Sequence, residues 1–428
     1  MTKIEQQLKQ SRKASLELAQ WSLKKKNEAL EFLATLIEKN SAKLLLENAK
    51  DLKREKNKLS RALYQRLSLD ESKLKQVVQG IRDISSLPDP VNSVLSETLL
   101  DDGLVLQKVS VPLGVVGVIF ESRPDVLPQV LSLMLKSGNA VVLKGGSEAM
   151  CTNKAFAKII AQLDKKCALP KGWAQLILSR KAVHEILKYP QYVSLVIPRG
   201  SNALVQSIMK NTKIPVMGHA DGICHLYIHE DANIDRALAL SIDSKTQYPS
   251  ACNAIETLLV HKKVAKEFLS LLFAQAKDLS LELRGCVKTK KILPQIKKAT
   301  LKDWATEYSD LILSVKIVES QAEAIEHIST YGSGHTDAIV SQDPQTIEHF
   351  FNSVDSAGVF ANASTRFADG FRYGFGAEVG ISTAKIHARG PVGLEGLTIY
   401  KYRLKGEGHL VSDYVGSDCR LFKHKKLY

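Results

Sequence analysis

Residues 115–125 read VVGVIFESRPD, and this stretch decides the fold class. Its first part is an unbroken apolar run of strand length, which is typical of a strand buried on both faces of a parallel sheet. Its second part is a polar loop containing proline. A largely apolar segment of helical length follows at 126–137, and Gly138-Asn139 ends it. The order strand, loop, helix predicts a parallel sheet covered by helices.

The same order recurs further along the chain. Residues 140–143 read AVVL and lead into a glycine-containing loop, and residues 193–197 form another strand-like run. A second region, 234–362, contains the apolar run 255–260 and a further strand-like segment at 336–340. We therefore predict an α/β protein with two doubly wound domains. Ligands are expected beyond the carboxyl ends of the parallel strands.

Two other parts of the chain have a different pattern. Residues 3–85 carry apolar residues at helical spacing, which predicts a layer of helices. Residues 93–111 predict a hairpin that turns at Asp101-Asp102-Gly103. Near the end, residues 397–402 read as an extended strand, and a polar, partly basic tail follows. A hairpin between a helical layer and an α/β region is expected to project and to pair with another subunit.

The composition excludes several classes of protein. The net charge of +14 suggests nucleic-acid binding, but in the N-terminal helices the charges alternate in sign, as expected of solvated helix faces. No aromatic residues interleave the basic runs as in a base-stacking surface. No apolar run reaches membrane-spanning length, and the polar residues 1–10 lack the apolar core expected of a signal peptide. The six cysteines lack zinc-type spacing, which predicts free thiols in a reducing cytoplasm and no metal site.

One cysteine stands in a favourable place for chemistry. Residues 245–257 read KTQYPSACNAIET, so Cys252 follows a proline-containing turn and precedes the buried strand at 255–260. A thiolate nucleophile needs partial exposure and a positive local field. The alternative is a buried cysteine that behaves as a small apolar residue. Asn253, beside the thiol, is a candidate hydrogen-bond donor.

Two glycine-containing loops end strands of the first predicted domain. They are Lys144-Gly145-Gly146-Ser147 and Arg199-Gly200-Ser201, and each opens a helix. Backbone N–H groups at a helix N-terminus bind anions, and Lys144 adds a point charge. A tight turn with a surface lysine is the alternative. Neither GxGxxG nor GxxxxGK[ST] is present, so we predict nucleotide binding without either fingerprint.

Other charged side chains are less specific. Arg123, in the first loop, is suited to a carboxylate or phosphate, but an ion pair with Glu121 or Asp125 is equally compatible with its position. Arg366 and Arg389 offer similar anion contacts in a late glycine-rich region. The histidines at positions 219, 335 and 387 lack metal spacing and are interpreted as structural.

Taken in order, these motifs resemble the gamma-glutamyl phosphate reductase family of the aldehyde dehydrogenase-like superfamily. The motifs that carry the resemblance are VPLGVVGVI (111–119), ESRP (121–124), KGG (144–146), IPRGS (197–201), YPSACN (248–253), YGSGHTDAI (331–339), NASTRF (362–367), FGAEVG (375–380) and HARGP (387–391). They span about residues 10 to 405. The run HADGICH at 219–225 and Asp125 look most like the reductase half of pyrroline-5-carboxylate synthase.

The resemblance implies a division of the chain into functional parts. Residues 1–92 and 112–233 are expected to bind NADP, and residues 234–362 to form the catalytic domain with Cys252. Residues 363–393 are expected to return as loops to the cofactor domain and the active-site cleft. The segments 93–111 and 394–428 are expected to form a β oligomerisation element of a homo-oligomer.

The resemblance also implies the reaction and the roles of residues. The reaction is NADPH-dependent reduction of L-glutamyl 5-phosphate to L-glutamate 5-semialdehyde, in proline biosynthesis, through a thioacyl group on Cys252. A separate glutamate kinase would supply the substrate. Asn253 is assigned to catalysis beside Cys252, with Ser122, Arg123, Asn362, Arg366, Glu378 and Arg389 binding substrate and Lys144, Gly145, Gly146, Ser147, Arg199, Gly200, Ser201 and His219 binding cofactor.

This sequence differs from ordinary aldehyde dehydrogenases at two positions. One bears on whether the acyl group is hydrolysed or reduced, and the other on whether the cofactor is NADPH or NADH. His219 stands where hydrolytic relatives have the glutamate that activates water, so the acyl group is expected to survive until hydride arrives; Asp221 lies close by. Ser147 stands where relatives that use NAD often have an acid, which favours NADPH, although Glu148 is its neighbour. A hydrolytic or CoA-acylating aldehyde dehydrogenase is the alternative on the same fold.

Overall fold

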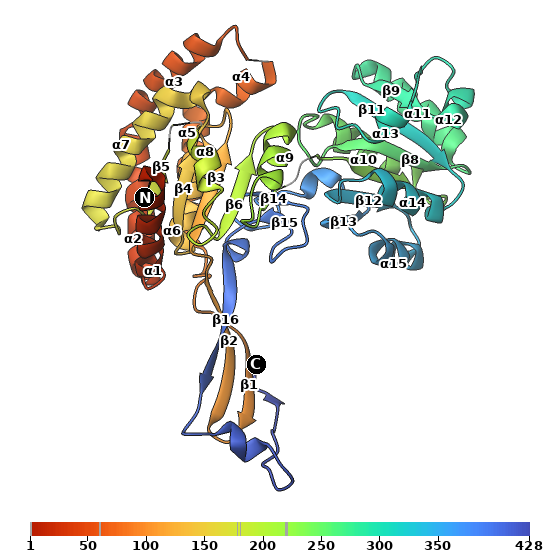
Figure 1. Ribbon diagram of the computed structural model, residues 1–428. Helices are drawn as coiled ribbons and strands as arrows, with labels where there is room; N and C mark the ends of the chain where they lie inside the picture. Colours follow the sequence, from red (N-terminus) through yellow and green to blue (C-terminus); the bar gives the residue numbers. More distant parts are fainter. Residues whose placement is uncertain (1, 60, 178, 180, 219–220) are drawn as a thin grey trace. The chain divides into compact units, whose positions relative to one another are not determined.

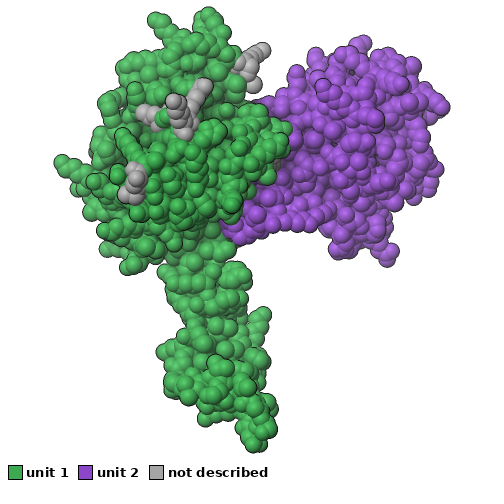
Figure 2. Space-filling view, in the orientation of Figure 1, with its two compact units in different colours: residues 1–217, 375–380, 392–428 green, residues 218–374, 381–391 purple. Residues whose placement is uncertain are grey.

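The computed structural model describes residues 2–59, 61–177, 179, 181–218 and 221–428. The chain forms two compact units, coloured separately in Figure 2. Unit 1 comprises residues 1–217, 375–380 and 392–428, and unit 2 comprises residues 218–374 and 381–391. None of the helices in the described ranges is both long enough and apolar enough to cross a membrane.

Unit 1 contains a four-stranded parallel sheet with the order β5-β4-β3-β6. The strands are β3 (Val115–Phe120), β4 (Ala140–Lys144), β5 (Ala174–Leu176) and β6 (Leu195–Arg199), and the helices between and after them are α6 (Val126–Lys136), α7 (Met150–Cys167), α8 (Lys181–Ile186) and α9 (Asn202–Lys210). Every residue of β3 and β4 is buried, as their unbroken apolar runs predict. The strand order reverses between β3 and β6, so their carboxyl ends flank the switch point of this sheet.

The N-terminal helices belong to unit 1, as predicted. They are α1 (Lys3–Leu18), α2 (Leu23–Lys39), α3 (Ser41–Glu55), α4 (Arg61–Leu67) and α5 (Glu71–Ser86). Leu30, Leu33 and Ile37 of α2 are buried and recur at the spacing of one helix face. Ser22 and Asp70 cap α2 and α5 by accepting from backbone N–H groups. In Figure 1 these helices stand beside α7 and the sheet of the same unit.

An antiparallel ribbon extends from the body of unit 1 (Figure 1). Its four strands have the order β16-β2-β1-β17 and are β1 (Val94–Asp101), β2 (Leu104–Pro112), β16 (Thr398–Lys405) and β17 (Lys425–Lys426). Gly103, at φ +74°, turns the predicted hairpin between β1 and β2. The C-terminal tail returns along β1, where the Glu97 N–H donates to the Tyr428 carbonyl at 3.0 Å. The tail therefore covers the edge of β1.

Unit 2 is built on a seven-stranded parallel sheet of order β10-β9-β11-β8-β7-β12-β13. The strands are β7 (Cys224–Ile228), β8 (Ile255–His261), β9 (Glu282–Gly285), β10 (Lys297–Lys298), β11 (Ile312–Val318), β12 (Thr336–Val340) and β13 (Gly358–Ala361). The helices are α10 (Ile234–Thr246), α11 (Ala265–Asp278), α12 (Val287–Ile292), α13 (Leu301–Trp304), α14 (Gln321–Tyr331) and α15 (Pro344–Ser353). All strands run the same way, so the sheet has an amino edge, where they begin, and a carboxyl edge, where they end.

The boundary between the units differs from the one predicted. The prediction assigns residues 112–233 to the cofactor domain, yet β7 pairs with β8 and β12 at the centre of the second sheet. Unit 2 therefore begins near residue 218 rather than 234. The glycine-rich stretch 363–393 is also divided between the units, and it contains the paired short strands β14 (Gly380–Ser382) and β15 (Gly390–Val392).

Candidate active site

Cys252 lies in the loop between α10 and β8, at the amino edge of the sheet of unit 2. The residue is partly exposed, so Cys252 is not a fully buried apolar residue. Gly222 passes close to it: a Cβ on Gly222 would lie 2.2 Å from the Cys252 carbonyl oxygen and 2.6 Å from its Cα. Only glycine lets the two backbones approach this closely.

A histidine contacts the thiol. Nε2 of His335 lies 3.2 Å from Sγ of Cys252, and its Nδ1 lies 2.8 Å from the hydroxyl of Thr336. His335 is 1% exposed and immediately precedes β12. Its sequence context indicates only a structural histidine and does not place it in the site. The two residues are 83 positions apart, so no local pattern indicates their contact.

A buried ion pair joins the two ends of the cysteine loop. Nζ of Lys245, at the end of α10, lies 2.5 Å from a carboxylate oxygen of Glu256 in β8, and their side chains are 0% and 1% exposed. Burial raises the pKa of Glu256 to about 7, against the opposing effect of Lys245. Burial likewise lowers the pKa of Lys245. The pair holds the start of β8 against the end of α10 and so restrains the loop that carries Cys252.

Asn253 serves the loop as an anchor. Its Nδ2 donates to the carbonyl of Ala368 at 2.9 Å, and the residue is 3% exposed. Within the described residues, the backbone N–H groups of Cys252 and Asn253 have no hydrogen-bond acceptor. These N–H groups, rather than the Asn253 side chain, are the available donors for an oxyanion that forms at the thiol.

Arg366 supplies positive charge near the nucleophile. It lies in the short helix Thr365–Phe367, is 8% exposed, and donates through Nε to Oε1 of Gln247 at 2.9 Å. Its guanidinium stands 5.8 Å from the centre of the Tyr248 ring. Burial and Arg372 lower the pKa of Arg366, whereas Cys252 raises it. The cation and the thiol are therefore close enough to interact, as a reactive cysteine requires.

The other two predicted substrate ligands of unit 2 lie at opposite edges of its sheet, Arg389 at the amino edge, beside Gly334, and Asn362 at the carboxyl edge. Arg389 donates to the Asp355 carboxylate and to its carbonyl, at 2.8 and 2.9 Å, so an acid of the same unit already engages it. Asn362 follows the carboxyl end of β13, at φ +53°, and its Nδ2 donates to the carbonyl of Ser341 at 2.8 Å. The structure places Asn362 at the carboxyl edge of the sheet, opposite the edge that carries Cys252.

In unit 1, the first glycine loop accommodates a carboxylate of its own chain. Lys144 ends β4 and is 9% exposed. A Cβ on Gly146 would lie 1.9 Å from a Glu148 carboxylate oxygen, and one on Gly145 would lie 2.3 Å from the Asn153 amide nitrogen. Ser122, at φ +44°, donates through its backbone N–H and its hydroxyl to Glu148, at 2.5 and 3.0 Å. Glu148 thus joins this loop to the loop after β3.

The second glycine loop has the same feature at the switch point. The Ser201 N–H donates to Oε2 of Glu121 at 2.8 Å, and a Cβ on Gly200 would lie 2.4 Å from that oxygen. The hydroxyl of Ser201 caps α9. These donors are oriented for an anionic oxygen at a helix N-terminus. Together with the cations of Lys144 and Arg199, they form a donor set that fits the phosphates of a dinucleotide.

Two further predicted substrate ligands lie in unit 1. Arg123 and Glu378 lie in unit 1, in the loop after β3 and in the segment 375–380, respectively. His219 lies outside the described residues, so its role toward the cofactor stays a prediction. No group of three or more His, Cys, Asp or Glu side chains suited to a metal ion occurs in the described parts of the chain.

The sequence matches a known protein family over most of its length. Residues 1–306 match the model of the aldehyde dehydrogenase family. The chain belongs to this family.

The particular branch follows from closer relatives. Gamma-glutamyl phosphate reductase of Acetivibrio thermocellus is 53% identical over 419 residues, covering 98% of this chain and 97% of that protein. The enzyme of the same name from Brachyspira hyodysenteriae is 51% identical over 426 residues, covering 98% of each chain. The crystal structure of gamma-glutamyl phosphate reductase from Thermotoga maritima matches with a TM-score of 0.93 at 38% identity, covering 96% of this chain and 100% of that one. Within the aldehyde dehydrogenases, this oxidoreductase belongs with the gamma-glutamyl phosphate reductases, which confirms the resemblance and the fold class.

Proposed function

We propose that the protein reduces L-glutamyl 5-phosphate to L-glutamate 5-semialdehyde with release of phosphate, using NADPH, as the second step of proline biosynthesis from glutamate. The observation that carries the proposal is Cys252, a partly exposed residue near Arg366 and His335, in a chain similar over 98% of its length to gamma-glutamyl phosphate reductases. A thiol in a positive field is suited to attack an acyl phosphate.

In the first step, Sγ of Cys252 attacks the acyl carbon. The S–C bond forms, the bond from that carbon to the phosphate oxygen breaks, and phosphate leaves with the bonding electrons. The backbone N–H groups of Cys252 and Asn253 are donors for the oxyanion that forms on the way. The charge of Arg366 favours an anionic substrate. A thioester on Cys252 results. Ser122, Arg123, Glu378 and Arg389 stay proposed substrate ligands.

The second step needs a cofactor, which the aldehyde dehydrogenase family takes as NAD or NADP. When bound, the reduced nicotinamide supplies a hydride to the thioester carbon. The residues that would hold the cofactor are those of the two glycine loops: Lys144, Gly145, Gly146, Ser147, Arg199, Gly200 and Ser201. Ser147 brings no charge that would repel a 2′-phosphate, and Ser122 engages the neighbouring Glu148. We therefore propose NADP as the physiological cofactor.

The test is the reverse reaction, with glutamate semialdehyde as substrate and either NADP or NAD as oxidant. We expect oxidation to require phosphate or arsenate, to prefer NADP, and to be lost in Cys252→Ala. Oxidation that proceeds without phosphate, or only with CoA, would reject the proposed substrate and support a hydrolytic or CoA-acylating aldehyde dehydrogenase. Equal rates with NAD would reject only the cofactor assignment.

Two further expectations belong to this proposal. We propose that the ribbon of unit 1 mediates a homo-oligomer, because Tyr400, Tyr402 and Leu404 of β16 are exposed there. The acyl phosphate must come from a kinase that phosphorylates a carboxylate, and a separate glutamate kinase fits that requirement. All six cysteines are free thiols, in agreement with the reducing cytoplasm that we propose as the location.

A further inference from the structure

We propose that His335 is a catalytic residue that transfers protons for Cys252: it removes the proton from the thiol before attack, and it delivers a proton from solvent to the sulfur after the aldehyde leaves. This inference rests on the proposed function, because it assigns a role within the same reaction. It concerns only unit 2, which contains both residues.

The geometry suits proton transfer. The 3.2 Å separation of Nε2 from Sγ is within hydrogen-bond reach, and the thiol is the atom that reacts. His335 is almost fully buried, so its imidazole is held in place rather than free to turn into solvent. Gly334 turns the chain just before it at φ +69°, and the His335 carbonyl accepts from the Gly358 N–H at 3.0 Å.

Thr336 orients the ring. Its hydroxyl lies 2.8 Å from Nδ1, and as an acceptor from Nδ1–H it leaves the lone pair of Nε2 directed at the sulfur. When Nε2 takes the proton, the same hydroxyl stabilises the imidazolium by accepting from Nδ1–H. A positioning role for Thr336 follows from this contact.

Three other ionisable groups near the amino edge, among the residues that the structure describes, already have partners. Lys245 and Glu256 pair with each other, and Glu307 accepts from the Gly222 N–H at 3.0 Å. Arg366 is a cation and cannot accept a proton. His335, in contrast, can accept one and lies in hydrogen-bond contact with the sulfur.

The proton balance is simple. In the first step the S–H proton moves to Nε2, the S–C bond forms and the carbon–phosphate oxygen bond breaks. The departing phosphate takes the imidazolium proton, which restores neutral His335. In the second step hydride adds to the thioester carbon, the C–S bond breaks, and the aldehyde leaves. The thiolate then regains a proton from solvent through Nε2. One acyl phosphate, one reduced nicotinamide and one proton give one aldehyde, one oxidised nicotinamide and phosphate.

The principal test measures alkylation of Cys252 by iodoacetamide, followed by mass spectrometry of its peptide, in the full-length protein. We expect His335→Gln to slow alkylation at about pH 7 by roughly 10-fold or more, and to lower acyl-phosphate reduction by about 10²-fold or more. His261→Gln is the matched control. His261 is also buried but lies at the carboxyl edge, where its Nε2 contacts the Glu319 carbonyl at 3.0 Å, so both rates should stay at the wild-type level.

A second pair of variants tests the orientation of the ring. Thr336→Val removes the hydroxyl, and Thr336→Ser keeps it. We expect kcat to fall by about 10-fold in Thr336→Val with KM unchanged, and Thr336→Ser to restore most of the rate. Equal kcat values in the two variants would reject the positioning role of Thr336.

Imidazole rescue covers the case in which His335→Gln folds poorly. Added imidazole should restore part of the alkylation and turnover of His335→Ala, because a diffusible base replaces the missing one. If His335→Gln or His335→Ala is folded and alkylates and turns over at wild-type rates, the role of His335 is wrong. If instead Cys252→Ala retains phosphate-dependent turnover, the proposed function itself fails, and the two failures are therefore distinguishable.

Discussion

In each unit, an acidic side chain at the switch point of the sheet accepts hydrogen bonds from backbone N–H groups at the start of a helix. In unit 1, Glu121 follows β3 and accepts from the Ser201 N–H, at the start of the helix that follows β6. In unit 2, Asp231 follows β7 and accepts from the N–H groups of Gln342 and Asp343, at the start of the helix that follows β12. Each acid thus occupies the helix N-terminus across the switch point, where a doubly wound sheet usually binds its ligand.

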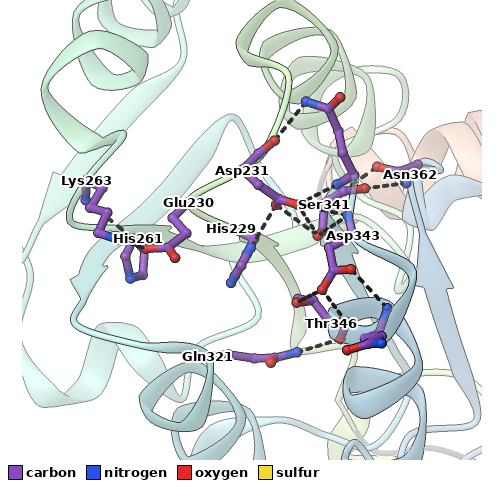
Figure 3. Close-up of polar contacts among 12 residues, drawn as sticks. His229, Glu230, Asp231, His261, Lys263, Gln321, Ser341, Asp343, Thr346 and Asn362 are labelled. Atoms are coloured by element: carbon purple, nitrogen blue, oxygen red, sulfur yellow. Dashed lines mark hydrogen bonds and ion pairs between the residues drawn. The ribbon is translucent and has the colours of Figure 1, made fainter.

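The difference between the two sites lies in the number of hydrogen bonds that the acid accepts. Asp231 accepts from the Ser341 hydroxyl and contacts Nδ1 of His229 at 2.7 Å, in addition to the two N–H groups (Figure 3). Asn362 also bonds to Ser341 in this cluster. Side chains of unit 2 itself therefore satisfy the helix N-terminus at this switch point. Parallel sheets usually bind ligands beyond the carboxyl ends of their strands, and this rule predicts the glycine loops of unit 1. Cys252 lies at the amino edge of its sheet, so the rule does not predict its position.

The largest effect is expected at the amino edge. Cys252→Ala should lower acyl-phosphate reduction by about 10³-fold or more, because it removes the nucleophile, while the fold stays intact. Steady-state rates and thermal unfolding of the same preparation measure the two properties. Residual activity within about 10-fold of the wild type would remove the thiol from the mechanism and with it the functional contrast between the edges.

The next effect concerns the pair that restrains the cysteine loop. Lys245→Met should lower the free energy of unfolding by about 3 kcal/mol, because it leaves the buried Glu256 without its counter-ion. Urea denaturation measures this. The double variant Lys245→Met with Glu256→Leu is the control and should recover most of the loss, since no charge stays buried alone. If the double variant is as unstable as the single one, lost packing rather than lost charge compensation is responsible.

At the carboxyl edge we expect an effect on stability alone. Asp231→Asn should lower the free energy of unfolding by about 2 kcal/mol, because the charged acceptor of several hydrogen bonds is lost, with kcat and KM unchanged. Glu230→Gln is the matched control. Its ion pair with Lys263 is exposed, and its loss should have no measurable effect. A fall in kcat for folded Asp231→Asn would contradict a purely structural carboxyl edge.

The smallest effect concerns pH. Burial lowers the pKa of His327 from 6.5 to about 3, with smaller contributions from His225 and Lys316. Below about pH 6.5, His327 binds a proton in the unfolded chain but stays neutral in the folded chain. The free energy of unfolding therefore falls as pH falls toward 3.

Between about pH 7.5 and 5.5 this linkage amounts to about 1.4 kcal/mol. His327→Phe removes it and keeps a ring that can contact Trp304, so its stability should fall less over this range. Urea midpoints at the two pH values measure the difference. Identical pH dependence in both proteins would show that His327 titrates normally.

Local sequence determined the elements and much of the chemistry. The buried runs of β3, β4 and β8, the hairpin at Gly103 and the loop position of Cys252 all follow from short patterns of burial and turn chemistry. The sequence also predicts the glycines of the two glycine loops. It does not predict that the carboxylates of Glu148 and Glu121 lie against them. A motif predicts Arg366 in the site, and the structure brings it to the cysteine loop.

Tertiary structure alone decided which strand ends meet. Only sheet order and register place β7 in unit 2, bring His335 to Cys252, place Asn362 at the opposite edge and bring Asp231 to the start of α15. The physical reason is that short-range sequence sets the period of burial along one element. Contacts between residues 83 positions apart depend instead on how all the strands of a sheet pack together.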